Sequence, residues 1–286
     1  MFPTGLAAGQ EAAPDRLVRE RYEAIASSVI CIRTVVEREL AMVNPVSGLM
    51  GTIRSPVAIQ GTGVVIDTVM ANGRKEYLIL TNAHVADPSR YLNLRGKFVT
   101  ELKGKDRPVP VPHESFVVDS WEDDQPGDDI RLVEIARDPA ADMALLETVH
   151  APRELSVFPG VIGYPENGVP PGGRVITSGF TVGGDRMITA EGTLTDLFYL
   201  HRLGQAHIDF STDLPLEPGQ SGSPVFLVLE SRKDGVRAVD FYLIGLLHAR
   251  QSDAHLLVPY ALWASTLVAA PRGGRREGAL ADPVRH

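Results

Sequence analysis

The sequence predicts an all-β protein built from antiparallel barrels or sandwiches, and three observations support this class. Apolar, β-branched segments of strand length recur along the 286-residue chain, separated by Gly, Pro, Asn and Asp. Few convincing helices lie between them, whereas a parallel sheet needs a crossover helix for nearly every strand. Finally, residues 148–160 carry two prolines and no strand periodicity, so they divide the strands into two halves.

Each expected element follows from its local pattern. The chain begins with an extension, residues 1–28, in which residues 15–28 have the apolar spacing of a short amphipathic helix. The first half, residues 29–147, contains expected strands at 29–36, 57–66, 76–85, 128–136 and 142–147. The second half, residues 148–270, contains them at 174–182, 186–194, 205–212, 223–230 and 240–249. We also expect a closing helix at 258–270, a disordered tail at 271–286 and a surface loop within 37–56.

Composition and charge exclude several classes of function. The 28 basic and 36 acidic residues give a net charge of -8, which argues against binding to nucleic acid or to an anionic membrane. No run of about eighteen apolar residues is present, and residues 1–28 lack the basic start and apolar stretch of a secretory signal. We therefore expect a cytoplasmic protein. A single cysteine, Cys31, cannot form an intramolecular disulfide, and no pattern indicates a metal or a cofactor.

The segment 216–226, LEPGQSGSPVF, places Ser221 among glycines just before an apolar strand. A nucleophilic serine needs a tight bend that presents its Oγ, and nearby backbone N–H groups that face a developing oxyanion. Glycine permits both because it lacks a Cβ. The same residue types also make ordinary turns, so the interpretation depends on partners elsewhere in the chain.

A base and an orienting acid are available for such a serine. His84 lies in LTNAHVAD, directly after an apolar strand and before the turn signal of Asp87 and Pro88. Asp142 lies in PAADMALLET at the edge of a core strand, where a carboxylate needs donors such as an imidazole N–H. Taken singly, His84 also fits a surface or capping role, and Asp142 fits a turn.

The order of the three residues favours a catalytic triad. His84 and Asp142 lie in the first half of the chain and Ser221 in the second, in the order His, Asp, Ser. This order belongs to the two-barrel design and differs from the orders of subtilisins and α/β-hydrolases. The sequence GQSGS also fails the G-x-S-x-G pattern because position 223 is serine, which disfavours the α/β-hydrolase alternative.

Five blocks resemble the trypsin-like (chymotrypsin-fold) serine peptidases. They are GTGVVI at 61–66, LTNAHV at 80–85, DMALLE at 142–147, IGYP at 162–165 and GQSGSPVF at 219–226. The resemblance runs from about Val29 to Leu267 and is strongest to the bacterial branch that includes glutamyl endopeptidases and the Deg/HtrA proteases. It implies two six-stranded antiparallel β-barrels with the active site in the cleft between them.

The resemblance also implies roles for individual residues. His84 would be the general base, Asp142 would hold its tautomer, and Ser221 would attack the substrate. The backbone N–H groups of Gly219 and Ser221 would form the oxyanion hole.

Two features depart from the family pattern. Digestive members place an aspartate before the nucleophile, which pairs with an α-amino group released by cleavage, whereas this chain has Gln220. Because a neutral amide cannot form that ion pair, we expect that the chain needs no proteolytic trimming. Only residues 271–286 follow the expected closing helix, fewer than the roughly 50 of a domain, so we expect no PDZ domain.

Substrate preference rests on two walls of the expected pocket. Pro215 occupies the family's usual specificity position, six residues before Ser221, and supplies no charge for a Lys or Arg side chain. Asp213 or Glu217 lining the pocket is the alternative that would favour basic residues.

The second wall is the strand LIGLLHARQ, which offers His248 and Arg250. In glutamyl-specific relatives a histidine of this strand contacts the residue before the scissile bond, although the spacing after Gly245 is one residue longer here. The expected preference is for acidic or small neutral residues. An ordinary strand position is the alternative for His248.

The leading interpretation is a serine endopeptidase that acts on polypeptides through an acyl-enzyme on Ser221. A catalytically silent two-barrel module that binds proteins is one alternative, disfavoured because the serine, the histidine and the glycine of the motifs are all present. An esterase is another, since it would share every catalytic residue. Whether a regulatory partner exists stays open.

Overall fold

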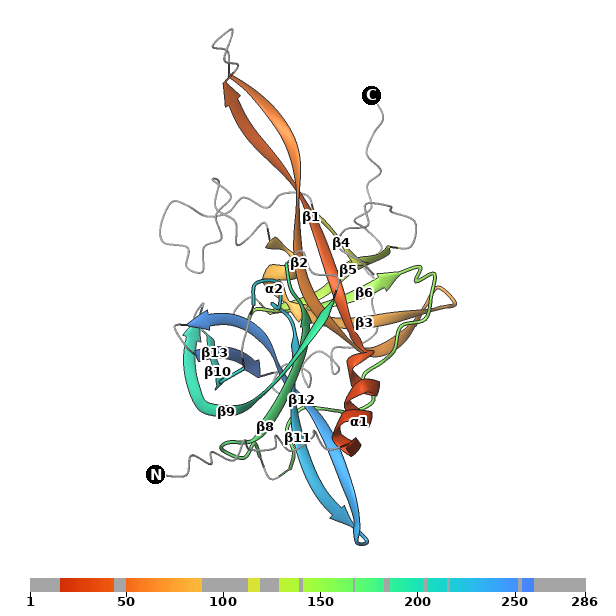
Figure 1. Cartoon of the computed structure of the whole chain (residues 1–286). Helices are drawn as coiled ribbons and strands as arrows, with labels where there is room; N and C mark the ends of the chain where they lie inside the picture. Colours follow the sequence, from red (N-terminus) through yellow and green to blue (C-terminus); the bar gives the residue numbers. More distant parts are fainter. Residues whose placement is uncertain are drawn as a thin grey trace, which may run out of the picture.

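The computed structural model describes residues 16–43, 50–88, 113–118, 129–138, 141–166, 168–182, 186–202, 205–214, 217–251 and 254–259. Within these ranges strands dominate, which confirms the expected all-β class (Figure 1). Helix α1 (Arg16–Ala26) is the helix expected near the start of the chain, and α2 (Ala83–Ala86) is a single turn between strands. Neither of these two helices is long enough to cross a membrane.

The first sheet is a closed six-stranded barrel. Its strands are β1 (Val29–Val43), β2 (Met50–Ala71), β3 (Arg74–Asn82), β4 (His113–Val118), β5 (Ile130–Asp138) and β6 (Met143–Val149). They pair antiparallel in the order β1-β2-β3-β6-β5-β4. Ile32, Ile79 and Leu146 are buried in its interior. Closure leaves the barrel without an unpaired edge.

The second sheet curls on itself. Its strands are β7 (Val161–Ile162), β8 (Arg174–Phe180), β9 (Met187–Arg202), β10 (Gln205–Thr212), β11 (Pro224–Lys233), β12 (Val236–Gln251) and β13 (Ala254–Pro259). The order is β11-β8-β9-β10-β13-β12-β7, and β11 also pairs with β12. Val175, Val225 and Ile244 fill its interior. The two sheets together confirm the two-barrel fold, but the second sheet has seven strands rather than the expected six, because β7 adds to β12 in parallel.

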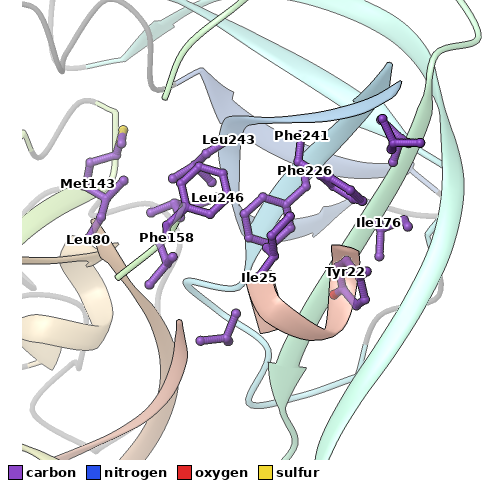
Figure 2. Close-up of a cluster of buried hydrophobic side chains, with 14 of the residues drawn as sticks. Tyr22, Ile25, Leu80, Met143, Phe158, Ile176, Phe226, Phe241, Leu243 and Leu246 are labelled. Atoms are coloured by element: carbon purple, nitrogen blue, oxygen red, sulfur yellow. The ribbon is translucent and has the colours of Figure 1, made fainter. Parts of the chain in front are cut away.

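An apolar core joins the two sheets and helix α1 (Figure 2). Phe226 of β11 stacks on Phe158 with ring centroids 5.1 Å apart, and Tyr22 of α1 meets Phe226 edge-on at 6.3 Å. Leu80 of β3 and Met143 of β6 belong to the same cluster. Burial of these large side chains favours one placement of the sheets against each other. The end of β3 therefore lies beside the second sheet.

The expected surface loop within 37–56 is wrong. Residues 37–43 pair one by one with residues 50–56 and extend the β1–β2 hairpin beyond the barrel (Figure 1). Ladder hydrogen bonds pair the inward-facing backbone groups of a two-stranded ribbon and water can pair the outward-facing ones, so neither face of the ribbon needs to be buried. The apolar periodicity that marks half-buried strands is therefore a poor guide to such a ribbon.

The end of the described chain also differs from the expectation. A helix does not begin at Val258, because Val258 and Pro259 end β13 and pair with Leu246 and Gly245 of β12. The remainder of the expected helix, 260–270, and the expected tail, 271–286, lie outside the described residues. Strands β4, β7 and β13 have no counterpart among the expected strands.

Candidate active site

His84 lies in α2, the helical turn that follows β3. Asn82 precedes this turn with extended φ and ψ of -74° and 149°. The backbone carbonyl of Asp142 accepts hydrogen bonds from Ala83 N–H and from the Asn82 side-chain amide, both at 3.0 Å. The turn before β6 thereby holds the start of α2.

Asp142 lies between β5 and β6 with a φ of 53°, a left-handed conformation that is uncommon for residues with a side chain. Its side chain is 10% exposed. Oδ1 accepts the His84 backbone N–H at 3.0 Å, and Oδ2 accepts the His84 imidazole at Nδ1 at 2.7 Å. Because a carboxylate only accepts, the imidazole proton is on Nδ1, which leaves Nε2 of neutral His84 as an acceptor.

The electrostatics of this pair favour opposite charges. Burial by itself lowers the pKa of His84, but the charge and the hydrogen bond of Asp142 outweigh it and raise that pKa above its usual value. Burial likewise raises the pKa of Asp142, but His84 and, more weakly, His248 reverse this and hold it below its usual value. Asp142 is therefore ionised at neutral pH, and His84 is more basic than a free imidazole.

A buried ion-pair cluster holds the other end of α2. Asp87 follows the helix, and its side chain is 4% exposed. Arg137 of β5 donates to Asp87 Oδ2 through Nη1 at 2.8 Å and to both oxygens of Glu134 through Nε at 2.9 Å. His113 of β4 places Nδ1 3.6 Å from Asp87 Oδ1. As a turn signal alone, Asp87 gave no sign of this pairing with Arg137, 50 positions away.

Ser221 is half-buried in the tight turn 217–223 that precedes β11. Gly219 and Gly222 flank it with φ of 97° and 85°. A Cβ on Gly219 would lie 2.4 Å from Val182 N, and one on Gly222 would lie 2.1 Å from Thr62 O. Both positions therefore require glycine for space as well as for conformation, which is the tight bend that the sequence predicts.

Hydrogen bonds attach this turn to the first barrel, close to His84. Thr62 N–H of β2 donates to Ser221 O at 2.8 Å, and Thr81 Oγ1 of β3 donates to Thr62 O at 2.6 Å. Thr62 Oγ1 accepts the backbone N–H of Phe180, at the end of β8, at 3.0 Å. Since Thr81 shortly precedes His84 in sequence, the structure brings Ser221 to the end of β3 that leads into α2.

The peptide bond between Pro218 and Gly219 has a defined orientation. Val182 N–H donates to Pro218 O at 2.9 Å, and the peptide bonds of the described segments are trans. Because the C=O and N–H of a trans peptide point in opposite directions, Gly219 N–H points away from Val182. Gln220 supports the turn from inside: its buried side chain accepts Glu217 N–H at Oε1 at 2.8 Å.

His248 of β12 lies against Asp142. Its Nδ1 is 3.9 Å from Asp142 Oδ2, and its side chain is 2% exposed. The preceding residue, Leu247, exchanges backbone hydrogen bonds with the turn before β11. Gly222 N–H donates to Leu247 O, and Leu247 N–H donates to Ser223 O, both at 2.9 Å. Strand β12 is therefore tied both to this turn and to Asp142.

The other residues expected at a substrate pocket are placed only in part. Pro215 lies outside the described residues, and Arg250 is described only through its backbone pairing with His255. Asp213, the alternative that would favour basic substrates, accepts hydrogen bonds from the backbone N–H and the hydroxyl of Thr193. Among the described residues, no group of three or more His, Cys, Asp or Glu is placed to hold a metal ion.

Comparisons with known structures agree with the two-barrel fold. The Rv3671c protease from M. tuberculosis, in its active form, is similar with 14% identity and a TM-score of 0.52, over 97% of this chain and 96% of that chain. The HtrA-type protease AlgW with a decapeptide is similar with 16% identity and a TM-score of 0.52, over 87% of this chain and 66% of that chain. A search of curated proteins finds no match.

The family match covers the candidate site. Residues 61–232 match the trypsin-like peptidase domain, and this range contains His84, Asp142 and Ser221. The expected resemblance is therefore confirmed. Since the match spans more than half of the chain, the protein belongs to the trypsin-like peptidase family.

Proposed function

We propose that the protein is a serine endopeptidase that cleaves polypeptides through an acyl-enzyme on Ser221. The observation that carries this proposal is the pair of hydrogen bonds between His84 and the carboxylate of Asp142, at 2.7 and 3.0 Å, at the strand end where the Ser221 turn is attached. This arrangement supplies a base, a group that orients it and a nucleophile.

The first half of the reaction forms the acyl-enzyme. Ser221 Oγ attacks the scissile carbonyl carbon while Nε2 of His84 takes the hydroxyl proton, which gives a tetrahedral intermediate and an imidazolium. Asp142 stabilises this imidazolium through Nδ1–H, at 2.7 Å. When the intermediate collapses, the C–N bond breaks, Nε2 returns its proton to the leaving amine, and an ester on Ser221 remains.

The second half releases the acyl group. A water loses a proton to Nε2 of His84 as its oxygen attacks the ester carbonyl carbon. Collapse of the second tetrahedral intermediate breaks the ester bond, frees a carboxylic acid and returns the proton to Ser221 Oγ. The chain then has the same protonation states as at the start.

The backbone N–H groups of Gly219 and Ser221 would stabilise the oxyanion in both intermediates. The orientation of the Pro218–Gly219 peptide supports this role, because its carbonyl is bound by Val182 N–H and its own N–H points the opposite way. Donors that are already aligned need no reorganisation during the reaction.

For the residue before the scissile bond, we propose that Lys and Arg are disfavoured and that acidic or small neutral side chains are accepted. Pro215 supplies no charge, and the Asp213 carboxylate is already bound by Thr193. A peptide-library cleavage profile tests this preference. Dominance of Arg or Lys before the cut would contradict it and would indicate that Asp213 or Glu217 lines the pocket.

A fluorophosphonate probe tests the nucleophile. The uncut parent chain should be labelled at Ser221, as located by peptide mass mapping, and should also hydrolyse a denatured protein. Ser223→Ala is the matched control, because Ser223 is a fully buried serine of the same turn whose Oγ has no hydrogen-bond partner. It should keep the labelling that Ser221→Ala loses.

Two outcomes would contradict the proposed activity. A folded parent chain that is not labelled would be a silent binding module. Labelling at Ser221 with hydrolysis of esters but not of peptides would identify an esterase.

A further inference from the structure

His248 is the extra residue of a β-bulge. In the β12–β13 ladder Leu247 pairs with Leu257 and Ala249 pairs with Leu256, so His248 has no opposite residue. A bulge re-aims a side chain that would otherwise follow the alternation of its strand. The His248 imidazole lies with Nδ1 3.9 Å from Asp142 Oδ2.

The imidazoles of His84 and His248 face the same carboxylate oxygen of Asp142. Oδ2 of Asp142 accepts His84 Nδ1–H at 2.7 Å, while Oδ1 accepts the His84 backbone N–H. Within the described part of the chain, His84 and His248 are the two ionisable side chains that pair with this carboxylate. A change at His248 therefore acts on the oxygen that orients His84.

We propose that His248 is a positioning residue for the reaction, which acts on His84 through Oδ2 of Asp142 and limits how strongly that oxygen stabilises the His84 imidazolium. The proposal rests on the proposed function. The separation of 3.9 Å is that of an electrostatic contact and exceeds hydrogen-bond length. Because the side chain is 2% exposed, water screens this contact little. The same burial leaves little of His248 for a substrate side chain to touch.

The sign of the effect on His84 follows from charge. A positive charge or an N–H dipole on His248 draws negative charge on Oδ2 toward itself. Less of that charge then stabilises the His84 imidazolium, so His248 opposes the effect of Asp142 and lowers the pKa of His84. Removal of His248 should therefore raise the pKa of His84 and reduce the fraction of neutral base at acidic pH.

The test replaces His248 by Phe, which keeps a ring of similar size without a donor. The His84 titration is followed by NMR on the histidine-labelled 286-residue chain, and the pH dependence of Ser221 labelling is measured alongside. We expect both midpoints to move to higher pH by about half a unit. His248→Gln keeps an N–H donor, so the His84 midpoint in this variant should lie between those of the parent and His248→Phe.

His113→Phe is the matched control. His113 also lies beside a buried carboxylate near α2, but that carboxylate is Asp87, 3.6 Å away at Oδ1. Its replacement should leave the His84 midpoint unchanged. If His248→Phe shows no cooperative thermal transition, His248→Leu takes its place.

The outcomes separate the two proposals. The role of His248 would be overturned if the His84 midpoint were the same in the parent, in His248→Gln and in His248→Phe, or in His248→Leu where that variant replaces His248→Phe. An unlabelled Ser221 in the parent would overturn the proposed function, whereas the NMR titration would still report on His248.

Discussion

The imidazole of His84 carries the pH dependence of the proposed reaction at the scale of single residues. Its neutral form is the base, so kcat/KM should fall as pH drops through the pKa of His84. Asp142 raises this pKa, and we expect the midpoint of the acidic limb above the ordinary value of 6.5. A pH profile of kcat/KM, measured with a peptide substrate, checks the midpoint.

Removal of the Asp142 charge tests the cause of that midpoint. In Asp142→Asn an amide can donate to Nδ1 and hold the wrong tautomer, so kcat should fall by a factor on the order of 10⁴. The stabilising charge is also lost, so the residual activity should have its midpoint at lower pH than the parent. A variant with the parental rate and midpoint would contradict the role given to Asp142.

At the scale of elements, the proposed mechanism depends most on the conformation of the turn 217–223. Gly219→Ala would place a Cβ 2.4 Å from Val182 N and would displace the Pro218–Gly219 peptide. We expect kcat/KM to fall by about 10²–10³, as for the loss of one oxyanion donor. Gly235→Ala is the control, because Gly235 has a similar φ of 79° and a Cβ added there would have nothing within 4 Å. It should cost stability of about 1 kcal/mol and leave kcat/KM unchanged.

The position of the helical turn α2 depends on the buried ion pair between Arg137 and Asp87. Arg137→Ala would remove the guanidinium that pairs with the buried Asp87 carboxylate, and the free energy of unfolding should fall by roughly 3–5 kcal/mol. Arg131→Ala on the same strand breaks an exposed pair with Glu114, in which both side chains are 58% exposed, and should cost less than about 1 kcal/mol. Urea unfolding measures both. Equal losses would show that Arg137 does not clamp α2.

At the scale of the whole molecule, contacts within the turn and in the core between the sheets hold the Ser221 turn in place in the uncut chain. The side chain of Gln220 accepts Glu217 N–H, and Tyr22 of α1 packs on Phe226 in the core between the sheets. We therefore predict that the uncut 286-residue chain reacts with an active-site probe. Gel mobility and intact mass before and after labelling check that the chain is uncut. Labelling that begins only after trimming of the N-terminal segment would contradict this prediction.

Local patterns predicted much of this fold and site. The strands of both sheets carry apolar, β-branched runs, and the residues of the His84–Asp142 pair and of the Ser221 turn lie in short motifs at strand ends. The features that the sequence did not predict are contacts between side chains that lie far apart in the sequence. Arg137 meets Asp87 through the closure of the first barrel, and His248 reaches Asp142 through a bulge, neither of which a single local segment can reveal.

The central claim is that Ser221 is the nucleophile of a peptidase, and the most direct measurement is the hydrolysis rate of Ser221→Ala. The hydroxyl contributes chemistry and little volume, so the thermal midpoint should stay close to that of the parent. We expect kcat for a peptide substrate to fall by a factor of about 10⁶, with no further loss when His84→Ala is added, because triad members act as a unit. A folded Ser221→Ala protein that hydrolyses the peptide at the parental rate would contradict the account.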